Sequence, residues 1–311
     1  ITLMSTDGPD ETIIQLGSGV GIEITTGADG FVLGGSEGHG FKILSAETGT
    51  TFAVQIVNNP NNVEISYNVI NTTGSASMAI NIGAGGATNL TIKYNEFITE
   101  EGDNAIVGGS AAGPIVNPTV SDNTFTSTPG STSGIAVQFT DTENATITGN
   151  TINNYGTGIC LHGQNDGSVT NVTISDNTIS GCKKGIAIGH SSTTDTISNV
   201  TMELNTISSN GKGLWIDSDS GIRVGTLTVE NNTFSNNAEY GLENTHTDEI
   251  NATLNWWGDD TGPSEIGSGY GDAVSTNVLY APWLGMYEKS IEPTLVKGGY
   301  TGLFSVTVKN T

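Results

Sequence analysis

Short stretches in which apolar and polar residues alternate recur along the whole chain. In one of them Val172 and Ile174 alternate with Thr173 and Ser175, which is the period of a strand with one buried face. A second apolar stretch follows each of these after a glycine, as in 134–137, 158–161, 185–188 and 213–216. The pattern therefore predicts two or three short strands per repeat and no long helix.

An asparagine after the first strand fixes the length of the repeat. Asn68, Asn95, Asn123, Asn150, Asn177, Asn205, Asn232 and Asn255 are separated by 27, 28, 27, 27, 28, 27 and 23 residues. A unit of this size cannot bury its apolar side chains alone, so successive units must stack as coils with parallel strands about 4.8 Å apart. The asparagines then form a ladder at one corner. Two looser turns, around 12–14 and 31–33, precede the ladder.

These features predict an all-β chain folded as a right-handed, single-stranded parallel β-helix of about ten coils, with a rod length of roughly 45–50 Å. We assign residues 1–285 to the β-helix and residues 286–311 to a C-terminal strand extension. The extension is predicted to be either the start of a sandwich-like domain or a donor strand for a neighbouring subunit. Its apolar positions Leu303, Phe304, Val306 and Val308 are the candidate assembly residues.

The segment 177–188 resembles the parallel β-helix repeat of pectate-lyase-like folds and of the NosD-type periplasmic family. The segment 255–263, with 271–274 and 282–284 after it, is similar to the closing motif of such helices in S-layer-type surface proteins of archaea and bacteria. The resemblance covers roughly residues 1–285. It implies the fold and an extracellular or cell-surface location, whereas function does not follow from fold.

The chain is strongly acidic. It has 9 Lys and Arg residues against 32 Asp and Glu residues, for a formal net charge of −23. Such a surface repels nucleic acids, anionic membranes and polyuronates. No apolar run reaches the roughly 20 residues of a membrane span. The only arginine, Arg223, follows Asp217 and Asp219, and a solvated loop explains this group better than a catalytic site does.

No catalytic residues or cofactors are assigned. Structural calcium is an open alternative at Asp7, Asp10, Asp259, Asp260 and Asp272, which lie in glycine-rich loops. His162 and His190, one repeat apart, lack an evident third metal ligand. We expect Cys182 to point inward, Cys160 to point outward, and no disulfide between them.

Seven asparagines stand in N-glycosylation sequons, and the repeat itself generates four of them, Asn89, Asn144, Asn171 and Asn199. The others are Asn71, Asn231 and Asn251. An outward threonine column at 91, 119, 146, 173, 201 and 228 raises ice binding as a rival function. The column beside it includes Lys93, Glu203 and Glu230, and these charges argue against it.

We therefore expect a non-enzymatic structural protein that self-assembles as a filament, sheath or surface layer, with another copy of itself as partner. The alternative is a carbohydrate-binding module or a glycan-cleaving enzyme, either a glycoside hydrolase or a polysaccharide lyase. That alternative would require a groove lined by aromatic side chains with carboxylates nearby. Its candidate aromatics are Trp215, Trp256, Trp257, Tyr270 and Trp283.

Overall fold

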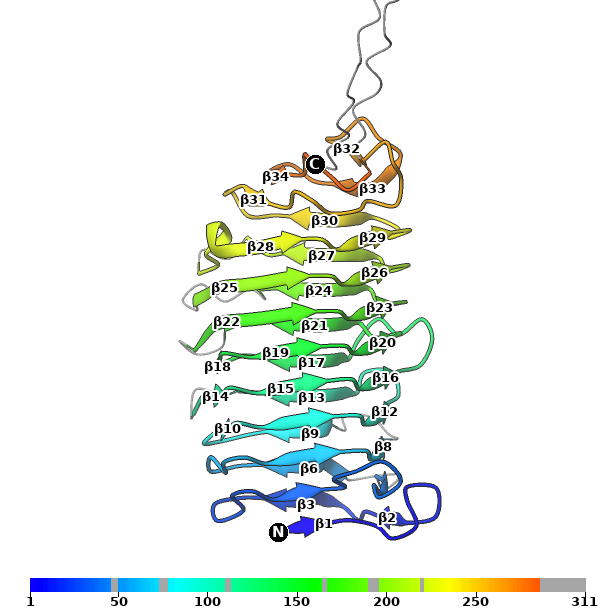
Figure 1. The fold of residues 1–311 in the computed structure, drawn as a ribbon, viewed down its shortest axis with the longest axis vertical. Helices are drawn as coiled ribbons and strands as arrows, with labels where there is room; N and C mark the ends of the chain where they lie inside the picture. The colour runs from blue at the N-terminus through cyan, green and yellow to red at the C-terminus, as the bar shows by residue number, and fades with distance from the viewer. Residues whose placement is uncertain are drawn as a thin grey trace, which may run out of the picture.

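The computed structural model describes residues 1–45, 50–72, 78–109, 113–163, 167–189, 196–218 and 221–285. These residues form a rod of stacked coils, and each regular coil carries three strands (Figure 1). All strand pairs are parallel, and their partners come from successive coils. The strands line three faces, which we call sheets A, B and C.

Sheet A contains the strand that ends at the asparagine corner. It comprises β1 (Thr2–Leu3), β4 (Val32–Leu33), β7 (Glu64–Ser66), β11 (Thr91–Lys93), β15 (Thr119–Ser121), β19 (Thr146–Thr148), β22 (Ser168–Ser175), β25 (Thr196–Glu203) and β28 (Leu227–Glu230). Three short strands extend it sideways and join at β22: β10 (Ala87–Thr88), β14 (Ile115–Val116) and β18 (Thr142–Glu143).

Sheet B follows the asparagine corner and has nine strands of three residues each. They are β2 (Ile13–Gln15), β5 (Lys42–Leu44), β8 (Val69–Asn71), β12 (Glu96–Ile98), β16 (Thr124–Thr126), β20 (Thr151–Asn153), β23 (Thr178–Ser180), β26 (Thr206–Ser208) and β29 (Thr233–Ser235). Each regular coil contributes one strand to sheet B. The described part of the chain therefore has about nine regular coils rather than the predicted ten.

Sheet C holds the second strand predicted for each repeat, and it continues into the closing segment. It comprises β3 (Gly19–Ile24), β6 (Thr50–Ile56), β9 (Met78–Ile82), β13 (Asn104–Gly108), β17 (Ile135–Phe139), β21 (Thr157–Leu161), β24 (Lys184–Ile188), β27 (Lys212–Ile216), β30 (Tyr240–Asn244), β33 (Gly271–Val274) and β32 (Pro263–Glu265). One 3₁₀ turn, η1 (Val224–Thr226), interrupts the coils.

The predicted asparagine ladder is confirmed and fully buried. The Oδ1 of Asn150 accepts the backbone N–H of Asn123 at 3.0 Å and its Nδ2–H at 3.1 Å. The Nδ2 of Asn150 in turn donates to Asn177 at 3.0 Å. Each corner thus satisfies a backbone donor that would otherwise be buried without a partner. Inside the rod, Phe97 stacks on Phe125 with ring centroids 4.7 Å apart.

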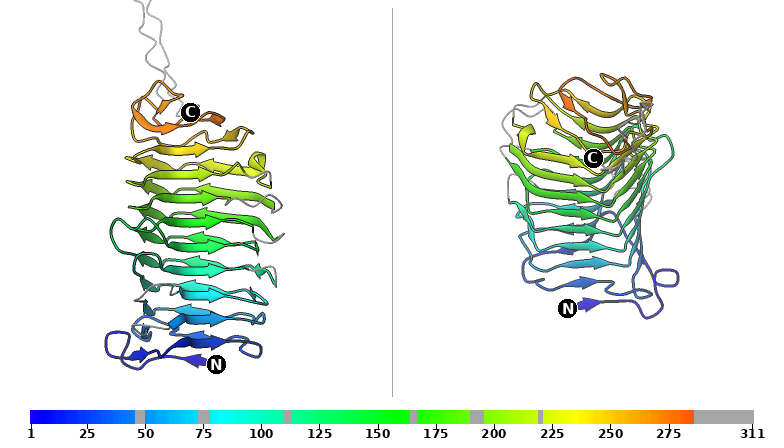
Figure 2. Two further views of the ribbon diagram at one scale, coloured as in Figure 1. Left: turned by 180° about the vertical axis from the view of Figure 1, so that it is seen from behind. Right: turned by 45° about the horizontal axis from the view of Figure 1, so that its top comes forward.

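Residues 256–285 form a closing segment over the last coil (Figures 1 and 2). Its strand β33 pairs with β30 through Leu242 and Val274, and β34 (Val278–Leu279) pairs with β31 (Ile250–Asn251). Trp257 is fully buried and stacks on Phe234 at 4.9 Å, so the closing segment covers the apolar core. The candidate assembly residues Leu303, Phe304, Val306 and Val308 lie outside the described residues.

Candidate functional site

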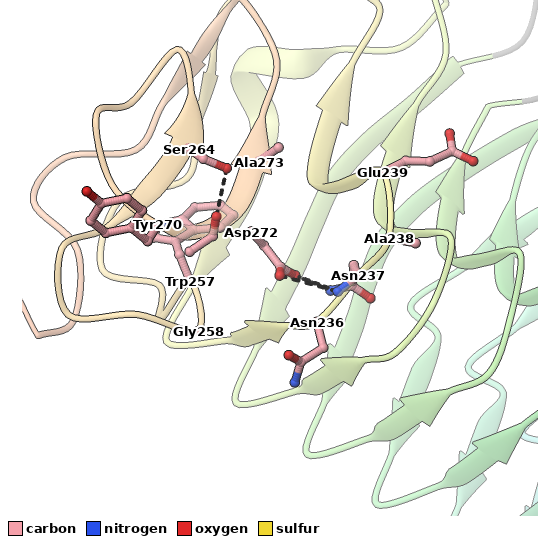
Figure 3. Close-up of a pocket in the computed structure, with 11 residues that line it drawn as sticks. Asn236, Asn237, Ala238, Glu239, Trp257, Gly258, Ser264, Tyr270, Asp272 and Ala273 are labelled. Carbon is pink, nitrogen blue, oxygen red and sulfur yellow. Dashed lines mark hydrogen bonds between the residues drawn. The ribbon is translucent and has the colours of Figure 1, made fainter.

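A cavity of about 230 Å³ lies between the last regular coil and the closing segment (Figure 3). The coil contributes Asn236, Asn237, Ala238 and Glu239 to its lining, and the closing segment contributes Trp257, Gly258, Ser264, Tyr270, Gly271, Asp272 and Ala273. Tyr270 is 85% exposed, so its side chain extends almost wholly into solvent beside the cavity. The indole N–H of Trp257 is buried and has no hydrogen-bond partner among the described residues.

Asp272 ends a second internal ladder at the corner between sheets B and C. Cys182 donates its backbone N–H to Asn210 at 2.9 Å, and Asn210 donates its own to Asn237 at 3.0 Å. Asn237 then donates its Nδ2–H to Oδ2 of Asp272 at 2.6 Å. Burial raises the pKa of Asp272, and the hydrogen bonds from Asn237 and Asn236 only partly oppose this.

Charged and aromatic side chains continue from this cavity over the outer face of sheet C. Glu239, on the cavity wall, lies 3.5 Å from Nζ of Lys212, which also binds Glu243 at 2.6 Å. Glu243 pairs in register with Trp215. The ammonium of Lys184 lies 3.2 Å from the centroid of the Trp215 ring, which is a cation–π contact.

The two lysines on this face differ in their electrostatics. Burial and the nearby charge of Lys212 lower the pKa of Lys184. Burial also acts to lower the pKa of Lys212, but the hydrogen bond and charge of Glu243, together with Glu239, raise it overall. Lys212 thus compensates two carboxylates, and this face is closer to electrical balance than the chain as a whole.

Of the five predicted aromatic candidates, Tyr270 is exposed, and Trp215 is partly exposed on the outer face of sheet C. Trp257 is buried in the core. The Nε1–H of Trp283 donates to the carbonyl of Asp260 at 3.3 Å, and Trp283 packs near Tyr280. A Cβ on Gly285 would fall 2.5 Å from the ring of Trp256. Trp256 and Trp283 therefore pack within the closing segment.

The structure does not bring the five calcium candidates together. Asp259 accepts the N–H and hydroxyl of Thr261, and these hydrogen bonds lower the pKa of its exposed carboxyl. Asp272 accepts a hydrogen bond from the side-chain amide of Asn237, and Asp7 accepts one from the hydroxyl of Thr6. In the described part of the chain, no three His, Cys, Asp or Glu side chains are close enough to hold a metal ion. Structural calcium remains a prediction.

Cys182 lies in the apolar core, as expected, and Cys160 points outward, as expected, but it is covered by other side chains. Both thiols are free and 97% buried, with exposures of 3%. Cys160 occupies an outward column of sheet C between Gln138 and Ala187. Strand alternation predicts the outward direction of Cys160, but it does not predict the side chains that cover the outer face. His162 bonds Gln138 at 2.7 Å, while His190 lies outside the described residues.

The four repeat-generated sequon asparagines form an exposed ladder. Their backbones are left-handed, with φ of 53° to 57°, a region that asparagine tolerates better than most residues. The Nδ2 of Asn144 donates to Asn117 at 3.0 Å, and that of Asn171 donates to Asn144 at 3.1 Å. The sequon pattern therefore has a structural origin. Glycosylation of these asparagines, and of Asn71, Asn231 and Asn251, stays a prediction.

A second cavity, of about 520 Å³, lies beside η1. Its lining includes Arg223, Ser218, Thr226, His246 and Asp248. Nδ1 of His246 accepts the backbone N–H of Asp248 at 3.0 Å, which leaves the proton of a neutral ring on Nε2. Asp217 does not line this cavity, and Asp219 lies outside the described residues. Asp217 and Arg223, which the sequence raised as a candidate group, therefore do not both line this cavity.

Among the described residues, no helix is long and apolar enough to cross a membrane. Residues 119–256 match the family model for a right handed beta helix region. No curated protein matches the sequence.

Similar solved structures include the tailspike protein of the E. coli bacteriophage HK620 in complex with a pentasaccharide. It has 14% identity and a TM-score of 0.46, with 82% of this chain and 50% of that chain covered. A double mutant of the same tailspike, also with pentasaccharide, has 13% identity and a TM-score of 0.46, with coverages of 82% and 53%.

The chain spans about half the length of these tailspikes, and the likeness carries no argument about function. The resemblance to S-layer-type proteins stays a prediction. The parallel coils and the family match together show that this chain folds as a right-handed parallel β-helix, as the sequence predicts.

Proposed function

We propose that this β-helix is an extracellular module that binds neutral glycans over its closing segment and the adjacent part of sheet C. The observation that carries the proposal is the cavity beside Tyr270, where an exposed ring lies next to amides, a hydroxyl and carboxylates. Ligand sites of this kind combine aromatic surface with a few polar groups that fix the orientation of the ligand.

The polar groups suit the hydroxyls of a sugar. Asn236 offers a donor and an acceptor at the cavity, and Glu239 offers a strong acceptor. The hydroxyl of Ser264 donates to the carbonyl of Gly271, so its oxygen remains as an acceptor. Trp215 and Lys212 extend the surface away from the cavity along sheet C, far enough for more than one sugar unit. The net charge of −23 favours a neutral glycan over a uronate polymer.

The proposal is for binding and not for cleavage. Asp272 is the carboxyl in the cavity whose pKa is raised, as a general acid requires. Its oxygens, however, accept three hydrogen bonds from Asn237, so the carboxyl serves the internal ladder. Glu239 is held near Lys212. Neither carboxylate is therefore placed to act alone on a glycosidic bond.

Affinity electrophoresis through gels that contain neutral or uronate polysaccharides tests the proposal. We expect at least one neutral glycan to retard the protein, with no release of reducing ends. Tyr270→Asn should abolish the retardation. Tyr94→Asn is the matched control, because Tyr94 is 46% exposed at the corner between sheets A and B. The proposal fails when no neutral glycan retards the protein, or when both variants lose binding equally.

Self-association is a second candidate function, and the first coil favours it. Its large apolar side chains are exposed: Leu3 at 45%, Met4 at 46%, Ile13 at 54% and Val20 at 39%. A cluster of this kind is typical of a protein–protein contact. We propose that copies of the chain associate through this coil, as a filament or surface-layer subunit would.

Sedimentation velocity and negative-stain microscopy test association directly. Ile13→Lys should convert assemblies to single rods, because it places a charge in the apolar contact. Ile266→Lys is the control, since Ile266 is equally exposed at 54% but lies in the closing segment. Single rods in the unsubstituted protein at all concentrations would exclude association through the first coil.

A further inference from the structure

The outer face of sheet B carries two columns of uncharged hydroxyl and amide side chains over five consecutive coils. The first column is threonine in every coil: Thr124, Thr151, Thr178, Thr206 and Thr233. The second column is Thr126, Asn153, Ser180, Ser208 and Ser235. We call these ten residues the sheet B array.

The array is regular in both directions. Each strand from β16 to β29 pairs with the next residue by residue, with no shift of register. Equivalent side chains are therefore separated by about 4.8 Å across the strands and by about 6.7 Å along each strand, where the two columns are two residues apart. The strands also stack in a straight line along the rod (Figure 1).

The array is also held rigidly. Behind it, the middle residue of each strand is buried in the core, as with Ile152, Ile179 and Ile207. At the adjacent corner, the buried asparagine ladder ties each coil to the next, for example Asn177 to Asn205 at 3.0 Å. On the face itself, the hydroxyl of Ser180 donates to Asn153 at 2.8 Å.

Neither column contains a charged or aromatic side chain in these five coils, although the chain as a whole carries a net charge of −23. The corner beside the array does carry Asp122 and Asp176. Sheet A differs, because its outer columns include Glu203 and Glu230 within the same stretch of rod. The absence of aromatic platforms from the array also separates it from the proposed glycan site.

We propose that the sheet B array binds the surface of ice. A rigid lattice of neutral donors and acceptors can share hydrogen-bonded water with a crystal of similar spacing, and the spacing of about 4.8 Å across the strands is close to that between oxygen rows in hexagonal ice. Charged side chains would instead hold disordered hydration water. Threonine also presents a methyl group, which displaces loosely held water from the contact.

This inference is independent of the proposed glycan function, because the two surfaces lie on different sheets. The occupant is a water crystal rather than a protein copy, since the array lacks the exposed large apolar side chains that the first coil has. A copy of the chain docked on sheet B is the rival that the test below separates from ice.

The test measures thermal hysteresis and inhibition of ice recrystallisation with the full chain, produced without glycosylation. We expect the unsubstituted protein to shape ice crystals and to inhibit recrystallisation. Thr178→Tyr places a bulky ring at the centre of the array and should abolish both effects. Thr173→Tyr is the matched control, because Thr173 faces outward on sheet A in the same coil and should leave both effects unchanged.

Circular dichroism melting of both variants checks that each retains the fold. The inference is overturned when the unsubstituted protein neither shapes ice nor slows recrystallisation, or when the two folded variants lose activity to the same extent. A dimer that Thr178→Tyr dissociates, with no effect of the unsubstituted protein on ice, would also overturn it.

Discussion

The carboxylate of Asp272 accepts both the backbone N–H and the side-chain amide of Asn237, at 3.1 and 2.6 Å. The same two donors of Asn210 are accepted by a single amide oxygen, Oδ1 of Asn237. Asp272 thus occupies the position that an asparagine occupies in the preceding coils. It also forms part of the wall of the cavity, so the end of a structural ladder contributes to the proposed binding surface.

The first prediction concerns the pH dependence of stability. Burial raises the pKa of Asp272 in the folded state above the usual value for an aspartate, so folding favours the protonated form. This contribution to stability is present at low pH and is lost as pH rises through the folded pKa. The free energy of unfolding should therefore fall as pH rises through that pKa.

Asp272→Asn isolates this contribution, because an amide oxygen can accept the same two hydrogen bonds without a charge. The variant should fold and should show a weaker fall of stability with pH in urea titrations between pH 4 and pH 7. Asp259→Asn is the control, since hydrogen bonds from Thr261 lower the pKa of Asp259 instead. An unchanged pH profile in Asp272→Asn would contradict the assigned role.

The second prediction concerns the two asparagine ladders. Asn150→Ala should lower the free energy of unfolding by about 3 kcal/mol, because it leaves the buried N–H of Asn123 without an acceptor. Asn144→Gly removes a member of the exposed ladder and retains the left-handed backbone, so the loss should be about 1 kcal/mol or less. Urea denaturation measures both losses of unfolding free energy. Equal losses would contradict the expectation that the buried ladder stabilises the fold more than the exposed ladder does.

The third prediction concerns a column of small residues in sheet C. Ala136 stands opposite Gly158, and Gly185, Gly213 and Gly241 follow in register. A Cβ on Gly185 would lie 2.6 Å from the carbonyl oxygen of Gly213. Gly185→Ala should therefore destabilise the fold by about 1–3 kcal/mol. Gly225→Ala, with open space around the new methyl group, should cost far less in the same thermal unfolding assay.

The fourth prediction concerns thiol reactivity. Burial raises the pKa of Cys160 to about 12 and that of Cys182 to about 11, so almost no thiolate forms at pH 8. Neither cysteine should react with a disulfide reagent in the folded protein, and both should react after denaturation. Rapid labelling of native Cys160 would contradict its burial on sheet C.

The repeat made much of the fold predictable. The asparagine at each corner is required by a buried backbone donor, so its spacing in the sequence reports the length of each coil directly. The prediction of about ten coils was slightly too high because Asn255, the last ladder asparagine, leads into the closing segment and not into a further strand of sheet B. The outward orientation predicted for Cys160 was right, but its burial was not predictable because strand alternation does not describe what covers the outer face of sheet C.

The surfaces were harder to predict than the core. Tyr270 and Glu239 are 31 residues apart in sequence and meet only because the closing segment folds over the last coil. The sheet B array was not predicted, because the expected outward threonine column lies on sheet A and the strand after the Asn177 corner was not identified as a separate strand. The threonines that alternate with Ile179 were therefore not recognised as a separate face.

Hydrogen–deuterium exchange with and without a panel of neutral oligosaccharides tests the central claim most directly, because it locates the binding surface without a substitution. The account predicts slower exchange in residues 212–216, 236–243 and 257–273, with sheets A and B unchanged. Protection confined to another face, or no protection by any neutral oligosaccharide, would contradict a glycan site at the closing segment.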